Sequence, residues 1–363
     1  MIIVNIISSS RGGGAEVLVN ELHQRYVRRK FDAYAIYSIS ETYSPSHNET
    51  VLGINPRNPL NIILIREILK LHGGNGNGNV IAHVHLTWPF FYASLASLGL
   101  NNVRLIYTEH NTTNKRRNIS LLWVLERLLY SRYERIICIS DAVRKSLENW
   151  VGSKISQRLV TIPNGSRVYA VIERSTLEGR TPRLISVGSL SSRKNFATAI
   201  IAIAQLRDEV ESYAIIGEGS ERPRLERLIE DLKLGDKVKL LGWSDDIEAH
   251  LHAADIQLIP SLWEGFGLVA VEGMSTGLPV VASNVDGLRE VLDEDNPSVI
   301  LVDSPESVDE WVSCIRGSVE NIHDKGFNSI ATTSRHQAEK FTLEKMADQY
   351  LATYRDVLAE QNN

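Results

Sequence analysis

Two glutamates spaced eight positions apart, Glu264 and Glu272, point most clearly to chemistry in this chain. Residues 253–260 before them have the pattern of a buried strand that ends at a proline, so a glycine-containing loop and a helix are expected to follow. The first amides of a helix lack partners and attract phosphate, and here they belong to Phe266, Gly267 and Leu268. Glu264 would lie on the sugar side of a bound diphosphate, and Glu272, about two helical turns on, would reach a ribose. The spacing predicts a nucleotide-sugar site.

A second pair of residues supplies positive charge. Arg193 and Lys194 lie in a loop that begins at Gly188, after an expected strand over 183–187. When a nucleoside diphosphate leaves a sugar, it gains negative charge that cations at fixed positions stabilise. Arg193 and Lys194 are candidates for such cations, and a solvated Arg-Lys pair in a surface loop is the alternative.

No metal ion is required when side chains supply the cations. Asp245 and Asp246 resemble a metal motif, but we interpret them as the cap of a helix over 247–253. The two cysteines, Cys138 and Cys314, lie in apolar surroundings, which argues against a zinc site or a disulfide framework. They favour a reducing compartment, and we expect a cytoplasmic protein.

A run of three glycines, residues 12–14, follows the first expected strand and opens a helix. Backbone amides in this position can approach phosphate closely. The run lacks the spacing of a dinucleotide-binding motif, which argues against an oxidoreductase.

Five motifs in a fixed order extend the pattern along the chain. They are residues 12–16 (Gly-Gly-Gly-Ala-Glu), 162–165 (Ile-Pro-Asn-Gly), 187–195 (Val-Gly-Ser-Leu-Ser-Ser-Arg-Lys-Asn), 216–219 (Ile-Gly-Glu-Gly) and 264–283, which contains both glutamates. In this order the chain resembles the retaining glycosyltransferases of family 4, of the bacterial polysaccharide-assembly type, which have the GT-B fold and an E-x7-E motif. The resemblance runs from the first strand to about residue 292.

The resemblance implies an α/β architecture, the GT-B fold: two doubly wound Rossmann-like domains facing across a deep cleft, with a C-terminal helix crossing back to the first domain. We expect an acceptor-side domain over 1–172, joined by a helix at about 345–363, and a nucleotide-sugar donor domain over 173–344. The polar stretch 170–182 lacks periodicity and is the expected linker.

The alternation of apolar patterns agrees with this architecture. Strands are expected at 2–7, 33–37, 80–85, 103–108, 135–139 and 159–162, with helices near 14–30, 59–71, 90–99, 119–132 and 141–149 and a last amphipathic helix over 341–358.

The resemblance also assigns roles to individual residues. The expected catalytic residues are His110, Arg193, Lys194 and Glu264. The expected donor-binding residues are Gly13, Gly14, Gly188, Glu218, Trp243, Phe266, Gly267, Leu268 and Glu272. Candidate acceptor contacts are His85, Thr87, Glu109 and Asn111. Many family members carry arginine where this chain has Ser189, and Arg193 is the side chain that could compensate.

The implied reaction is transfer of a hexosyl unit from an NDP-sugar to an acceptor hydroxyl, with retention of configuration. The usual proposal for the family is a front-face substitution without an enzyme nucleophile. The NDP-sugar is a substrate, so no cofactor is expected. A lipid-linked or surface-polysaccharide precursor is the expected acceptor.

Charge is distributed unevenly along the chain. Residues 1–170 carry 20 Lys and Arg against 11 Asp and Glu, a net charge of +9, whereas the remainder carries 19 against 33, a net charge of −14. One basic cluster surrounds the apolar helix expected at 119–132: Lys115, Arg116, Arg117, Arg127, Arg132 and Arg135. This combination fits a helix at an anionic membrane surface, on the inner face of the cytoplasmic membrane, or a solvated helix packed on the core. Nucleic acid is not expected, because stacking aromatics are not interleaved with the basic residues.

Two other functions fit the same architecture. A nucleotide-sugar epimerase would bind the same donor without an acceptor, and a non-catalytic nucleotide-sugar or glycan binder would need none of the charged residues. The presence of His110, Arg193, Lys194, Glu264 and Glu272 argues against a non-catalytic binder.

Overall fold

The computed structural model describes residues 1–10, 13–40, 46–73, 79–111, 120–174 and 176–360, with only the backbone described at 120–122. The chain forms two compact units, one of Met1–Gly165 with Leu343–Asn363 and one of Ser166–Thr342. The chain passes from the first to the second unit after Gly165, upstream of the expected boundary at 172/173, and returns at Leu343.

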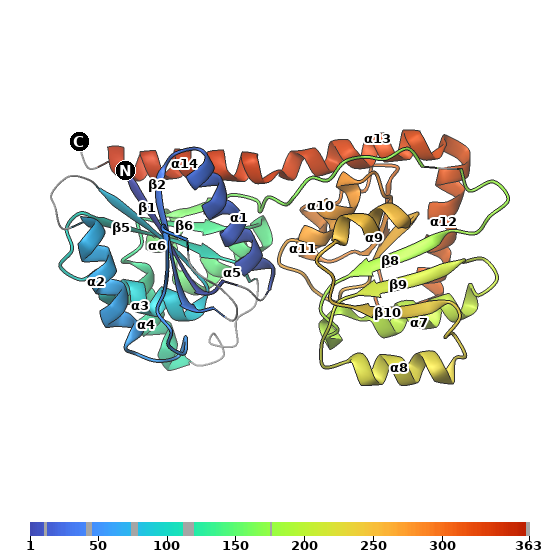
Figure 1. Cartoon of the computed structure of the whole chain (residues 1–363), viewed down its shortest axis with the longest axis horizontal. Coiled ribbons are helices and arrows are strands. Elements are labelled where there is room, and N and C mark those ends of the chain that lie inside the picture. The colour runs from blue at the N-terminus through green and yellow to red at the C-terminus, as the bar shows by residue number, and fades with distance from the viewer. Residues whose placement is uncertain (11–12, 41–45, 74–78, 112–119, 175, 361–363) are drawn as a thin grey trace. The chain divides into compact units, whose positions relative to one another are not determined.

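The first unit is built on a seven-stranded parallel sheet (Figure 1). The strands are β1 (Ile2–Ser9), β2 (Asp32–Ile39), β3 (Glu49–Val51), β4 (Val80–His85), β5 (Val103–Glu109), β6 (Arg135–Cys138) and β7 (Leu159–Thr161), in the order β3-β2-β1-β4-β5-β6-β7. All residues of β4 are buried, as expected for a parallel strand covered on both faces.

Helices cover this sheet. They are α1 (Gly14–Arg28), α2 (Asn61–Gly73), α3 (Thr87–Ala96), α4 (Ser120–Tyr130), α5 (Asp141–Val151), α6 (Ser153–Ser156) and α14 (Leu343–Ala359). In the core, Leu22 and Tyr26 of α1 belong to the same apolar cluster as Met346, Tyr350 and Tyr354 of α14. The C-terminal helix α14 therefore completes the core of the first unit, although it follows the second unit in the sequence.

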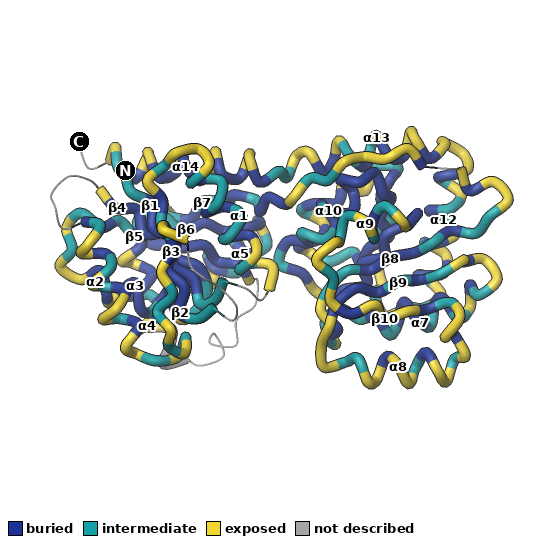
Figure 2. The backbone as a smooth tube through the Cα atoms, in the orientation of Figure 1, coloured by how far each residue is buried: buried dark blue, intermediate teal, exposed yellow. Residues whose placement is uncertain are grey.

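The second unit has a six-stranded parallel sheet in the order β10-β9-β8-β11-β12-β13. The strands are β8 (Arg183–Val187), β9 (Ser212–Ile216), β10 (Val238–Gly242), β11 (Ile256–Ile259), β12 (Val280–Ser283) and β13 (Val299–Val302). The helices are α7 (Phe196–Gln205), α8 (Arg222–Asp231), α9 (Ile247–Ala253), α10 (Leu268–Ser275), α11 (Asp286–Arg289), α12 (Val308–Lys325) and α13 (Phe327–Ala338), with short 3-10 turns η2 (Ser192–Lys194) and η3 (Glu339–Phe341). In Figure 2 the strands of each unit are mostly buried and the outer helix faces exposed.

Each unit is thus an α/β, Rossmann-like layer structure, as the sequence predicts. Each sheet also reverses its strand order once, between β1 and β4 in the first unit and between β8 and β11 in the second. Loops that leave neighbouring strands in opposite directions open a crevice at such a point, and ligands of open α/β sheets bind there. We therefore expect the predicted site residues to lie in the loops that follow these strands.

Candidate functional site

A charged cluster occupies the reversal point of the second unit. Lys194, at the end of η2 after β8, pairs through Nζ with Oε1 of Glu264, after β11. Arg193 Nη1 lies 3.5 Å from Glu264 Oε2. Glu264 and Lys194 are each only 8% exposed. The structure therefore brings three of the four predicted catalytic residues together, as two cations sharing one carboxylate.

Two further contacts hold this cluster in place. Ser261 Oγ donates to Glu264 Oε1 at 2.8 Å, and the Arg193 guanidinium stacks over the Trp263 ring at 4.5 Å. The Leu262 amide also donates to the Arg193 carbonyl at 2.8 Å, which ties the loop after β11 to the loop after β8. Sequence reasoning missed Ser261, although its position three residues before a glutamate was a usable signal.

Glycines allow the loops after β8 and β9 to pack closely. Gly188 has a φ of +158° and donates its amide to the Ile216 carbonyl at 2.9 Å. A Cβ at Gly217 would lie 2.0 Å from the Gly188 carbonyl oxygen, so a side chain at Gly217 would push the two loops apart. Gly188, a predicted donor-binding residue, lies next to Lys194. A Cβ added at Gly188 would lie 3.1 Å from Lys194 Cε.

The helix start predicted to bind phosphate is formed by α10. Gly267 has a φ of +90° and caps the helix, and a Cβ there would lie 2.5 Å from Leu288 Cδ2. Within the described part of the chain, the amides of Phe266 and Gly267 donate to no acceptor. Gln257 in β11 donates to the Val269 carbonyl at 2.8 Å and so fixes the first turn of α10. These free amides lie on the same loop as Glu264.

Glu272 lies on α10, eight residues after Glu264 in the sequence. Ser166 Oγ donates to Glu272 Oε1 at 3.4 Å. Burial raises the pKa of Glu272 to about 7, and the nearby Arg167 opposes that shift. A carboxyl group with such a pKa changes charge near neutrality.

The remaining donor candidates follow β9 and β10 on the same edge of the sheet. Glu218 is paired with Arg222, whose Nε lies 2.9 Å from Oε2, so it is engaged in a local ion pair. Trp243 is 69% exposed and donates from Nε1 to Asp245 Oδ1 at 3.3 Å. Its exposed ring is available to a nucleotide base. Asp246 caps α9 by accepting from the Ala249 amide at 3.0 Å, as predicted.

In the first unit, His110 follows β5 beside the reversal point. Its Nε2 lies 3.2 Å from Nδ1 of His85, the last residue of β4. Both rings are buried, and burial lowers the pKa of His110 to about 4. His110 is therefore an uncharged imidazole at neutral pH.

The predicted acceptor contacts differ in accessibility. His85 is 1% exposed and bonded to His110. Glu109 is also 1% exposed, and it accepts from Tyr130 Oη at 3.2 Å and from the Asn111 amide at 3.3 Å. Thr87 is half-buried and Asn111 is exposed. Only Thr87 and Asn111 are placed to meet a ligand without rearrangement.

Gly13 and Gly14 begin α1 after β1. Gly13 caps the helix, and its amide donates to Glu16 Oε2 at 3.1 Å. A carboxylate of the protein itself thus occupies the position expected to receive phosphate. Gly12 lies outside the described residues.

The expected linker contains an anchor that sequence reasoning missed. Arg174 is 8% exposed and donates to the carbonyls of His252, Leu251 and Thr276 at 3.2–3.3 Å. Burial lowers the pKa of this guanidinium to about 10. Arg174 therefore fastens the polar stretch to the ends of α9 and α10. A lone arginine in a stretch without periodicity carries no signal for this role.

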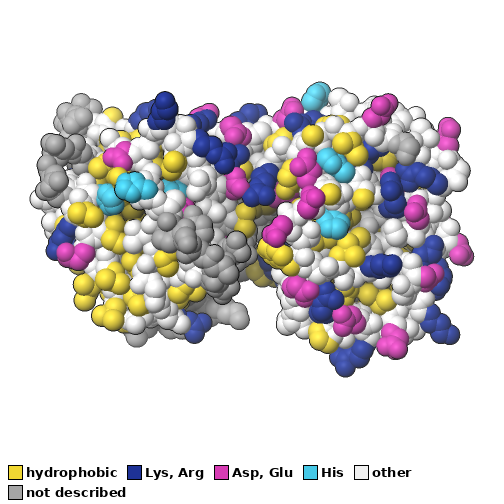
Figure 3. All heavy atoms as spheres, viewed as in Figure 1, with side chains coloured by type: hydrophobic (Ala, Val, Ile, Leu, Met, Phe, Trp, Pro, Cys, Tyr) yellow, Lys and Arg dark blue, Asp and Glu magenta, His cyan; other side chains and the backbone are white. Residues whose placement is uncertain are grey.

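The surface of the first unit around α4 is apolar. Trp123, Val124, Leu125 and Leu128 are 38–63% exposed, and Figure 3 shows hydrophobic side chains gathered over α2 to α4. Arg127 stacks over Trp123 at 4.5 Å, whereas Arg135 is paired with Glu360. The basic residues Lys115, Arg116 and Arg117 lie outside the described residues. No helix in the described part of the chain is long and apolar enough to cross a membrane.

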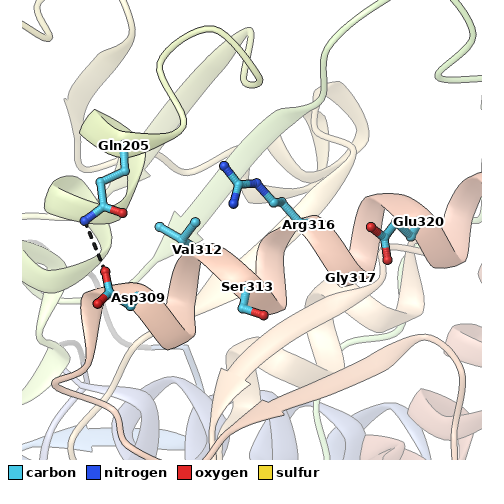
Figure 4. A pocket seen from close by; sticks show the side chains of 7 residues that line it. All are labelled: Gln205, Asp309, Val312, Ser313, Arg316, Gly317 and Glu320. Atoms are coloured by element: carbon cyan, nitrogen blue, oxygen red, sulfur yellow. Dashed lines mark hydrogen bonds between the residues drawn. The ribbon is translucent and has the colours of Figure 1, made fainter.

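A shallow pocket lies elsewhere on the second unit, between α7 and α12 (Figure 4). Gln205 donates to Asp309 at 3.3 Å across it, and Arg316 is paired with Glu209. None of the predicted site residues lines it, and two of its charged side chains, Asp309 and Arg316, are already engaged by the protein. The candidate site therefore remains the charged cluster in the loops after β8 and β11.

Comparison with known proteins agrees with the geometry. The family model "Glycosyl transferases group 1" matches residues 170–323, and "Glycosyltransferase Family 4" matches residues 12–167. Over 230 residues the chain is 26% identical to the lipopolysaccharide core biosynthesis glycosyltransferase LpsE of Rhizobium meliloti (strain 1021), covering 62% of this chain and 65% of that protein. Over 305 residues it is 26% identical to the UDP-Gal:alpha-D-GlcNAc-diphosphoundecaprenol alpha-1,3-galactosyltransferase of Escherichia coli, covering 77% and 76%.

A solved structure shares the fold over nearly the whole chain. Anabaena HepE in complex with UDP-glucose superposes with a TM-score of 0.80 at 19% identity, covering 98% of this chain and 100% of that one. The two family models together span both units, one on each. The chain therefore belongs to the group 1 and family 4 glycosyltransferases with the GT-B fold.

Proposed function

We propose that this protein is a retaining glycosyltransferase that moves a hexosyl unit from an NDP-sugar to an acceptor hydroxyl. The observation that carries the proposal is the cluster of Arg193, Lys194 and Glu264 at the strand-order reversal of the second unit. Two cations against one carboxylate leave a net positive charge beside the free amides that begin α10. A diphosphate has the charge and size to be held there.

Each residue of this cluster has a distinct role in the proposal. Lys194 and Arg193 stabilise the negative charge that develops on the departing diphosphate. Glu264, held by Ser261 and Lys194, accepts hydrogen bonds from hydroxyls of the donor sugar. Glu272 accepts from the ribose, and the Trp243 ring contacts the base. Because side chains supply the cations, the reaction proceeds without a metal ion.

The reaction at the sugar is a front-face substitution through an oxocarbenium-like state. In this proposal His110 is a catalytic residue that acts as an uncharged imidazole. The acceptor is a lipid-linked or surface-polysaccharide precursor. The relatives support this class, because one is named for lipopolysaccharide core biosynthesis and another for transfer to a diphosphoundecaprenol-linked sugar.

A lipid-linked acceptor requires the enzyme to work at a membrane. The exposed apolar residues of α4 and the net charge of +9 on residues 1–170 support peripheral binding to an anionic surface. We place the protein in the cytoplasm, on the inner face of the cytoplasmic membrane, with no nucleic-acid partner.

A transfer assay tests this function. The protein is incubated with UDP-, GDP-, ADP- or TDP-linked hexoses and with polyprenyl-diphosphate-linked sugars as acceptors, and the product linkage is determined by NMR. We expect one donor to yield a new glycosidic bond with the anomeric configuration of the donor. Inverted configuration would contradict retention, and isomerised donor without any transfer would favour an epimerase.

A further inference from the structure

Three histidines of the first unit form one cluster with the C-terminal helix. His83 and His85 lie two positions apart on β4, so their side chains share a face of the sheet. Their ring centroids are 4.2 Å apart, and His85 contacts His110 after β5. The exposed fractions of His83, His85 and His110 are 0%, 1% and 9%. The cluster therefore runs from the core to the surface, with His110 at the outer end.

His83 is held at both ring nitrogens. Its Nδ1 lies 2.5 Å from Tyr354 Oη of α14, and its Nε2 lies 2.7 Å from Thr108 Oγ1. Burial lowers the pKa of His83 to about 3, so the ring is uncharged and carries a single proton. Tyr26 Oη donates to Tyr354 Oη at 3.4 Å, which directs the Tyr354 proton to His83 Nδ1. His83 consequently carries its own proton on Nε2 and donates it to Thr108.

Among the residues that the structure describes, the side chain of His85 makes one hydrogen bond. Its Nδ1 faces His110 Nε2 at 3.2 Å, and its buried Nε2 has no partner among the described residues. For buried backbone groups, an N–H without an acceptor is rarer than a C=O without a donor, and the same preference is taken to hold for the imidazole ring. The proton of His85 therefore belongs on Nδ1 and is donated to His110 Nε2. This leaves His110, also uncharged, with its proton on Nδ1.

The backbone beside His85 is strained. Leu86 has a φ of +67°, in a region that a bulky side chain rarely adopts. Such strain persists only where the surroundings impose it, and it concentrates at functional sites. Here it separates the end of β4 from the start of α3, which begins at the next residue, Thr87. The strained residue thus adjoins the histidine that contacts His110.

We propose that His85, packed on His83 and supported by Tyr354 of α14, is a positioning residue that holds His110 as the tautomer protonated on Nδ1. His110 then offers an N–H donor at the outer end of the cluster. The proposal rests on the proposed function in one respect, namely that His110 acts on the reacting sugar or acceptor. It replaces the acceptor contact expected for His85 with a role exerted through His110.

Histidine nitrogen NMR tests the tautomer directly in the full-length protein. Protonated and unprotonated ring nitrogens differ widely in ¹⁵N chemical shift, so each tautomer can be read without any activity assay. We expect wild-type His110 to be protonated on Nδ1 and unprotonated on Nε2. Protonation of His110 on Nε2 would overturn the proposal.

Variants test the supporting contacts. His85→Asn keeps an amide N–H close to the position of Nδ1, whereas His85→Ala removes it. We expect His110 to keep its tautomer in the first variant and to become a mixture in the second. Tyr354→Phe should change the His83 signals and broaden those of His110. The matched control is Tyr133→Phe, because the hydroxyl of the buried Tyr133 bonds to Ser94 and to the Phe90 carbonyl and to none of the three histidines in the described structure. An unchanged His110 tautomer in His85→Ala would overturn the proposal.

Kinetics separates positioning from structural support. We expect His85→Ala to lower kcat on the order of tenfold, which is less than the full effect of losing a general acid or base. The donor KM should stay within about twofold of the wild-type value. His85→Asn should recover most of the loss. If His110→Ala kept the kcat of the wild type, the catalytic role assumed for His110 would be overturned. The NMR measurement tests the His110 tautomer independently of activity. The two failures are thus distinguishable.

Discussion

The candidate sites of the two units use opposite means to hold polar side chains at the edge of a parallel sheet. In the second unit, Lys194, Arg193 and Glu264 are held by charge. In the first unit, His85 and His110 are buried, uncharged and held by hydrogen bonds and ring packing. The charged cluster suits an anionic leaving group, whereas the neutral cluster suits a hydrogen bond to a sugar.

The charged cluster should be sensitive to loss of a single cation. Replacing Lys194 with alanine removes one fixed charge from the diphosphate site and leaves Glu264 without its closest partner. We expect turnover to fall on the order of 10²-fold, the scale for losing one preorganised group at a developing anion. Steady-state kinetics measures it, and Lys325→Ala, an exposed lysine on α12, is the control. Turnover within twofold of wild type would remove Lys194 from the site.

Between pH 6 and pH 8 the donor KM should change because Glu272 of the second unit titrates, and not because His83 or His110 does. Burial raises the pKa of Glu272 to about 7, so this carboxyl group is neutral below pH 7 and charged above it. The ionised form accepts ribose hydrogen bonds better, so donor KM should fall by about tenfold between pH 6 and pH 8, in proportion to the ionised fraction. The pKa values of His83 and His110, about 3 and about 4, lie below this window. In Glu272→Gln the change in KM should disappear. A persisting change would assign the titration to another group.

The exposed apolar surface of α4 should bind anionic lipid. Each basic residue near such a surface contributes about 1 kcal/mol, and the interaction is screened at high salt. We expect cosedimentation with vesicles containing phosphatidylglycerol but not with phosphatidylcholine vesicles. Val124→Glu with Leu128→Glu should reduce it several-fold without changing donor binding. Arg116→Glu, Arg117→Glu and Arg127→Glu should do the same. Equal binding to both kinds of vesicle, or none to either, would contradict the membrane proposal.

Metal removal should have the smallest effect. In the proposal, Arg193 and Lys194 neutralise the diphosphate in place of a divalent cation. Activity in excess EDTA should therefore equal that of the untreated enzyme within error. Loss of activity with recovery on adding Mn²⁺ or Mg²⁺ would show that side chains alone do not carry the charge.

The fold was predictable because its signals are local. Buried parallel strands appear as short apolar runs, so β1, β4 and β5 lie within a few residues of their expected positions. The strand β3, of three residues, and the helix α6, of four, carry too few residues for a periodic pattern and were not expected. The glycosyltransferase family and the two Rossmann-like α/β domains expected from the motifs are confirmed.

The site was predictable only where motifs marked it. The meeting of Lys194 with Glu264 follows from two loops on neighbouring strands. In contrast, the contact of Tyr354 with His83 joins residues 271 positions apart, and no local pattern announces it. The same holds for Arg174, which bonds carbonyl groups of two distant helices. Contacts made by buried polar groups depend on tertiary packing and leave no periodic trace in the sequence.

Binding of an NDP-sugar to the cluster of Arg193, Lys194 and Glu264 can be measured by thermal denaturation. The melting temperature of the wild-type protein is measured with UDP-, GDP-, ADP- and TDP-sugars, beside a variant carrying Arg193→Ala and Lys194→Ala. A ligand at 100 times its dissociation constant adds about 2.7 kcal/mol of stability. We expect at least one NDP-sugar to raise the melting temperature of the wild type, and the same ligand to leave the variant unchanged. An equal rise in both proteins, or no rise with any NDP-sugar at millimolar concentration, would contradict the assignment of the donor site to this cluster.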